Sequence, residues 1–125
     1  MSKKIKWRSS PKGKDYDGVR NFLTLLCSEG DADKLIERLH KAERIEHSGK
    51  DLLRAAALPA LSSEDPHVNK DLKDIQKGKA LAPVLLIRGD LKKAHPLVIA
   101  DGYHRVCASY IVDESSPISC RLVEL

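Results

Sequence analysis

The stretch Pro96-Leu97-Val98-Ile99-Ala100-Asp101-Gly102-Tyr103-His104-Arg105 decides how this 125-residue sequence folds. Its first half is a short, branched apolar run of the kind that forms a strand, and residues 103–112 have the apolar spacing of a helix. The positions expected to point inward from that helix are Val106, Cys107, Tyr110 and Ile111. The pattern predicts a strand that passes through a glycine turn directly into a helix.

The start of this helix has the features of an anion-binding site. The first N–H groups of a helix lack partners within it, and together with the helix dipole they favour a negative charge. Gly102 permits a close approach or an unusual φ, while His104 and Arg105 add side-chain donors, arginine as a charged fork suited to phosphate. We therefore interpret Gly102, Tyr103, His104 and Arg105 as a phosphate-binding loop. The alternative is that His104 and Arg105 are ordinary exposed helix residues.

Asp101 and His104 are the candidate catalytic residues of this loop. A carboxylate beside a bound phosphate can orient His104, coordinate Mg²⁺ through oxygen, or deprotonate an attacking hydroxyl. An Asp that precedes a helix also commonly caps it, and this structural role is an equal alternative for Asp101.

Working outward, two further strands and a helix complete an α+β domain over residues 49–125. Residues 83–88 and 117–123 are apolar strand patterns, and Pro66 opens a helix that is expected to end near Gln76, before Gly78. Residues 51–58 fit either a helix or a strand, and they carry Arg54 as a further candidate phosphate ligand. The prediction is a small mixed sheet with packed helices.

A helical hairpin is expected over residues 15–48, packed on that core. Its first helix carries an apolar stripe that stops at Gly30, and Asp31 is expected to cap the second helix. The stripe consists of Val19, Phe22, Leu23, Leu25 and Leu26. The hairpin covers a sheet or contacts a protein partner, and a DNA-reading role is the less favoured alternative because its charges are of mixed sign.

Residues 1–14 are basic and are expected to form a flexible arm. They hold six Lys or Arg residues and no acid, against a net charge of +4 for the whole chain. Such an arm contacts phosphates or an anionic membrane, or is simply solvated.

The order of these pieces resembles the ParB/sulfiredoxin superfamily over residues of about 50–125. The pieces are Leu53-Arg54, the Asp65-Pro66 helix start, Val84 to Gly89, Gly102-Tyr103-His104-Arg105, and Ser116-Pro117-Ile118. The resemblance implies a ParB/sulfiredoxin-like, or ParB-like nuclease, fold that binds ATP, ADP or CTP with Mg²⁺ or nucleic-acid phosphate. Some relatives are kinases or nuclease-like proteins in which a carboxylate near the phosphate is the base.

The chain departs from the family at three places. Sulfiredoxins have a nucleophilic cysteine where this chain has Tyr103, so the resemblance does not extend to sulfiredoxin activity. Val68 and Asp71 stand near the positions of a Lys and a Ser that hold ATP in sulfiredoxins. His67 or Lys70 is a candidate replacement for the missing cation.

Three cysteines without a C-x-x-C pair favour a reducing, cytoplasmic setting, and no apolar run approaches the length of a membrane span. The expected function is binding of nucleotide or nucleic-acid phosphate. One interpretation is an enzyme of phosphoryl transfer, NTP hydrolysis or nucleic-acid cleavage. The other is a non-catalytic regulatory module with a protein partner at the hairpin.

Overall fold

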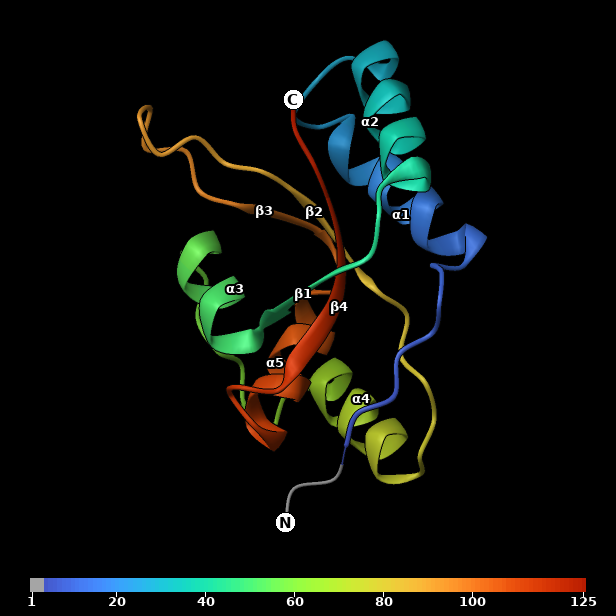
Figure 1. The fold of residues 1–125 in the computed structure, drawn as a ribbon, viewed down its shortest axis with the longest axis vertical. Coiled ribbons are helices and arrows are strands. Elements are labelled where there is room, and N and C mark those ends of the chain that lie inside the picture. Colours follow the sequence, from blue (N-terminus) through green and yellow to red (C-terminus); the bar gives the residue numbers. More distant parts are fainter. Residues whose placement is uncertain (1–3) are drawn as a thin grey trace.

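The structure is a computed structural model that describes residues 4–125. It is mixed α and β, with five helices and a four-stranded sheet in the described part of the chain (Figure 1). The elements are α1 Gly13–Leu23, α2 Glu29–Lys41, β1 Ile45–Ser48, α3 Gly49–Ala56, α4 Pro66–Gln76, β2 Val84–Ile87, β3 Val98–Asp101, α5 Tyr103–Val112 and β4 Pro117–Val123.

The sheet has the order β1-β4-β2-β3. The central pair, β2 and β4, is parallel, and the outer pairs are antiparallel, so the sheet is mixed as the sequence predicted. Figure 1 shows the α1–α2 hairpin on one side of the sheet and α3, α4 and α5 on the other. The helices therefore cover both faces.

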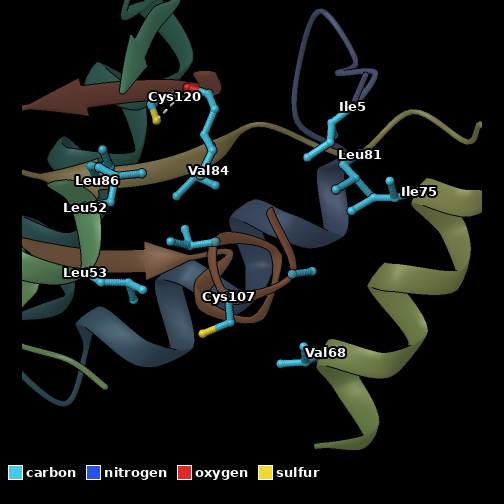
Figure 2. Packing of buried hydrophobic residues seen from close by; sticks show 13 residues of the cluster. Ile5, Leu52, Leu53, Val68, Ile75, Leu81, Val84, Leu86, Cys107 and Cys120 are labelled. Atoms are coloured by element: carbon cyan, nitrogen blue, oxygen red, sulfur yellow. Dashed lines mark hydrogen bonds between the residues drawn. The ribbon is translucent and has the colours of Figure 1, made fainter. Parts of the chain in front are cut away.

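The core consists of two clusters that meet at β2, whose four residues are all buried. Val84 and Leu86 pack with α3, α4 and α5, and Leu85 and Ile87 pack with α1 and α2. Successive side chains of a strand point to opposite faces, so one strand serves both clusters. Figure 2 shows Val84 and Leu86 on the side of Cys107 and Leu52.

The expectation of a flexible arm is wrong for residues 5–8. Leu81 exchanges two backbone hydrogen bonds with this segment, to Lys6 O at 2.8 Å and from Arg8 N at 2.7 Å. Ile5 is only 6% exposed and lies beside Leu81 and Ile75 (Figure 2). The apolar side chains of Ile5 and Trp7 anchor the segment despite the surrounding charge. Residues 1–3 of the expected arm lie outside the described residues.

The helical hairpin is present, but its boundaries differ from the expected ones. The first helix begins at Gly13 and ends at Leu23, so Leu25 and Leu26 lie in the exposed turn and do not extend the buried stripe. Ser28, whose hydroxyl accepts from Asp31 N at 3.2 Å, caps the second helix in place of Asp31. Residues 45–48, expected within the hairpin, form the edge strand β1.

The second half of the chain follows the predicted order. The three strands, the Pro66 helix and the helix after Gly102 lie where the sequence placed them, and the undecided residues 51–58 belong mostly to the helix α3. Ile111, expected to point inward, is exposed. Among residues 4–125, no helix combines the length and the apolar character that crossing a bilayer requires.

We predict that Ile5→Ala destabilises the fold by about 2 kcal/mol or more, because it removes a buried side chain from the larger cluster. Leu25→Ala, at a position 83% exposed, is the control and should change the free energy of unfolding by less than about 0.5 kcal/mol. Urea denaturation measures both. Equal effects of the two substitutions would show that residues 5–8 do not pack as described.

Candidate functional site

The loop at residues 101–105 joins the end of β3 to the start of α5. Gly102 is the N-cap of α5 with φ 102° and ψ 17°, a left-handed conformation that favours glycine. The first hydrogen bond of the helix runs from Val106 N to Gly102 O at 3.0 Å. The N–H groups of residues 102–105 therefore have no acceptor within α5, as the anion-binding interpretation requires.

A cleft of about 330 Å³ opens at this loop, between the starts of α4 and α5. It is lined by His67, Lys70, Asp71, Asp101, Gly102, His104 and Arg105. The structure thus brings together four of the predicted site residues and both of the suggested replacement cations. Val68, by contrast, is fully buried in the core and takes no part in the cleft.

Arg105 is held in place by Asp101. Its Nη2 donates to Asp101 Oδ2 at 2.8 Å and to the Pro83 carbonyl at 3.4 Å, and its side chain is 16% exposed. Its buried Nε has no hydrogen-bond partner among residues 4–125. The guanidinium lies over Gly102, where a Cβ atom would be only 2.8 Å from Nη2. This close approach is a second reason for glycine at position 102.

Two of the roles considered for Asp101 were to cap α5 and to orient His104. The structure shows it in neither role. The N-cap is Gly102, and the partner of the Asp101 carboxylate is Arg105. Burial raises the pKa of Asp101, and the charge and hydrogen bond of Arg105 oppose this shift without cancelling it. A carboxylate with a raised pKa suits a general base.

Asp71 is a second carboxylate of the cleft, although the sequence suggested it only as a departure from the family pattern. Burial raises its pKa, and the charges of Arg105 and Lys70 oppose the shift. The positive charge of Arg105 therefore acts on two carboxylates, those of Asp71 and Asp101. Helical spacing was the available signal, because Asp71 follows His67 by four residues and so shares its face of α4.

His104 faces the start of α4. Its Nε2 is 3.9 Å from Asp65 Oδ1, and its ring centroid is 4.8 Å from that of His67. Asp65 caps α4 by accepting from His67 N and Val68 N at 2.9 and 3.1 Å, and these bonds, that of Val68 foremost, lower the pKa of its carboxyl. Two helix starts and two imidazoles therefore converge on one side of the cleft.

Tyr103 does not line the cleft. Its hydroxyl donates to the Pro59 carbonyl at 2.6 Å, and its ring packs against the core. Cys107 is fully buried and burial raises the pKa of its thiol, so this cysteine cannot replace the nucleophile that Tyr103 lacks.

Arg54 is not brought to this loop, which corrects the expectation that it contributes to phosphate binding. It lies in α3, is exposed, and is 3.6 Å from Asp51 in an ion pair. It lines a separate cavity with Tyr110 and Glu114. The helix α3 directs Arg54 to solvent because Leu52 and Leu53 take the buried face.

No group of three or more His, Cys, Asp or Glu side chains within residues 4–125 is arranged to hold a metal ion. Asp71 and Asp101 are the carboxylates of the cleft. Mg²⁺ at nucleotide sites is held by one or two carboxylates together with phosphate oxygens. These two residues therefore fit a metal that arrives with a phosphate, and they do not form a complete metal site.

We predict that Gly102→Ala destabilises the protein by about 1–3 kcal/mol, because alanine is strained at this φ and its Cβ would meet Arg105 and Val84. Gly18→Ala in α1 is the matched control, since a Cβ there meets nothing within 4 Å, and it should stabilise by about 0.5–1 kcal/mol. Chemical denaturation measures both. Similar results for the two variants would contradict the described loop.

Comparison of the chain with protein-family models, with curated proteins and with solved structures finds no match.

Proposed function

We propose that this protein binds a phosphate group of a nucleotide or nucleic acid in the cleft, using a ParB/sulfiredoxin-like domain over residues of about 50–125. The observation that carries the proposal is that several hydrogen-bond donors converge on this cleft. The start of α5, whose first N–H groups have no acceptor within the helix, borders the cleft with the side chains of His104 and Arg105, and α4 adds His67 and Lys70. Backbone and side-chain donors combined in this way are typical of phosphate sites.

Arg105 has donors to spare for a ligand. A guanidinium carries five N–H donors, and Asp101 and Pro83 both contact the single nitrogen Nη2. Asp101 therefore fixes the Arg105 side chain and leaves most of its N–H donors available for hydrogen bonds to a ligand. Because the side chain is already ordered, binding a ligand costs less conformational entropy than it would for an exposed, freely moving arginine.

Two carboxylates in an anion site need an explanation, and Mg²⁺ supplies one. Asp71 and Asp101 are the residues that would hold Mg²⁺ brought by ATP, ADP or CTP, with phosphate oxygens as its other ligands. When bound, the ion would neutralise phosphate charge. A volume of about 330 Å³ is at the lower end for ligand pockets, so the cleft suits the phosphates and leaves the base outside.

We predict that Arg105→Ala weakens binding of inorganic phosphate, ATP and CTP at least tenfold, because a charged hydrogen bond contributes about 1.5–3 kcal/mol. The His104→Ala, Lys70→Ala double variant tests the same cleft without disturbing the Asp101 contact. Arg54→Ala, in the separate cavity, is the control and should bind as wild type does. Calorimetry measures the affinities. Unchanged affinity in both cleft variants would remove the cleft from the function.

Hydrolysis or phosphoryl transfer is a second candidate, favoured by the raised pKa of Asp101 at the phosphate site. In this case Asp101 takes a proton from the attacking water or hydroxyl, and the Arg105 side chain stabilises charge on the phosphate. NTPase and nuclease activities both fit this arrangement. Binding without turnover is the other outcome, and it fits a regulatory module whose hairpin turn, with exposed Leu25 and Leu26, contacts a protein.

We predict that Asp101→Asn abolishes turnover of nucleotide or nucleic acid while phosphate affinity is retained, because an amide oxygen still accepts from Arg105 but cannot act as a base. The wild-type rate should fall as pH decreases through the raised pKa of Asp101, at a pH above the ordinary carboxyl value of 3.8. Phosphate release and strand cleavage are the measurements. A wild-type protein that binds but turns over none of the substrates would overturn the catalytic candidate alone.

A further inference from the structure

The N-terminal segment presents a row of positive charge at the surface. Ile5 and Trp7 turn toward the core, and the alternate residues Lys4, Lys6 and Arg8 are exposed. The backbone bonds to Leu81 fix this alternation, since side chains of an extended segment point to opposite sides in turn. The backbone that carries these three cations is thus fixed against the domain and is not part of a loose arm.

The helix α4 carries a second row on its outward face. Lys70, Lys73 and Lys77 are exposed and follow one another at spacings of three and four residues, the spacing of a single helix face. The buried Val68 and Ile75 lie on the opposite face. The row extends about 10 Å along the helix, at a rise of roughly 1.5 Å per residue.

The two rows meet at the end of α4. Lys6 Nζ is 3.8 Å from the position that a Cβ of Gly78 would take, and Figure 1 shows the N-terminal segment passing alongside α4. We call this surface the basic strip. It consists of Lys4, Lys6, Arg8, Lys70, Lys73, Lys77 and Lys79. Lys70 also lines the cleft, so the strip leads into it.

The strip is poor in opposing charge. Residues 4–14 and 66–79 contain nine of the chain's 22 Lys and Arg residues but two of its 18 Asp and Glu residues. Asp71 faces the cleft, and Asp74 is 18% exposed and lies 3.3 Å from Lys70 and 3.8 Å from Lys79. Five cations of the strip form no ion pair within residues 4–125, namely Lys4, Lys6, Arg8, Lys73 and Lys77.

We propose that the basic strip binds the sugar–phosphate backbone of a nucleic acid and directs one of its phosphates into the cleft. This inference rests on the proposed phosphate binding and specifies a polynucleotide over a free nucleotide. The three-lysine row on α4 is about 10 Å long, and laid along the axis of a duplex it spans about three phosphates of one strand, at roughly 3.4 Å of axis for each phosphate. A single nucleotide would leave the remainder of the strip without a partner.

A nucleic acid fits this surface better than an anionic membrane does. Amphipathic segments that lie in a membrane surface expose large apolar side chains, which insert into the membrane, on the face opposite their basic residues. Within residues 4–125 the large exposed apolar residues all lie outside residues 4–14 and 66–79, at Phe22, Leu25, Leu26, Leu58, Leu91, Ile111 and Leu125. The apolar residues of the N-terminal segment are turned inward.

The test is the binding of single- and double-stranded oligonucleotides of about 20 residues to the full chain, followed by fluorescence anisotropy over a range of salt. The Lys73→Ala, Lys77→Ala double variant should lower the affinity about tenfold and reduce the slope of log K against log salt by about 1 for each lysine. Its affinity for inorganic phosphate should stay at the wild-type value. Lys92→Ala, Lys93→Ala, at two exposed lysines of the β2–β3 turn, is the control and should match wild type.

Three results would overturn the proposed role of the basic strip. The first is an equal effect of the strip and control variants on oligonucleotide binding. The second is no oligonucleotide binding at all, and the third is strip-dependent binding of anionic phosphatidylserine vesicles without binding of oligonucleotides. Each of these results leaves phosphate binding in the cleft standing. Normal binding of inorganic phosphate by both cleft variants, Arg105→Ala and the His104→Ala, Lys70→Ala double variant, would instead remove the cleft and leave any oligonucleotide effect of the strip intact.

Discussion

The burial of β2 on both of its faces is the constraint on which the rest of this structure depends. Val84 and Leu86 need one apolar layer and Leu85 and Ile87 need another, so helices must cover the sheet on two sides. The chain meets this requirement with the hairpin α1–α2 on one face and α3, α4 and α5 on the other. Parallel pairing with β4 places β2 inside the sheet and leaves β3 at the edge.

The cleft follows from that arrangement. β3 pairs with β2 through Asp101 opposite Leu85, so the loop after β3 lies beside the start of β2. The Pro83 carbonyl, just before β2, accepts from Arg105, and Val84 reaches to 3.0 Å from the position of a Gly102 Cβ. The loop therefore rests on the most deeply buried strand, and its donors are held by the core and not by a flexible connection.

Sequence reasoning succeeded where the determining interactions are local. A branched apolar run, a glycine and a helical pattern are contiguous, so the strand, turn and helix around Gly102 followed from adjacent residues. Reasoning failed where the partner is distant: Ile5 and Trp7 are isolated apolar residues, and contacts with the backbone of Leu81 and with the larger core cluster give them an ordered position. Likewise, β1 is too short to show a period, and its pairing with β4 fixes it. Arg54 was misplaced because the orientation of α3 depends on tertiary packing.

The charged residues of the cleft help to distinguish a ligand-binding site from a purely structural contact, or seam, between α4 and α5. Asp71 and Asp101 have raised pKa values because burial disfavours their ionised form, which means that ionised carboxylates here reduce stability at neutral pH. A seam with a purely structural role would gain from apolar side chains, since partly buried ion pairs seldom outweigh their desolvation. The buried Arg105 Nε, which has no hydrogen-bond partner among residues 4–125, adds a further cost. The proposed phosphate with its Mg²⁺ would offset the cost of the two carboxylates, whereas an apolar seam would incur neither cost.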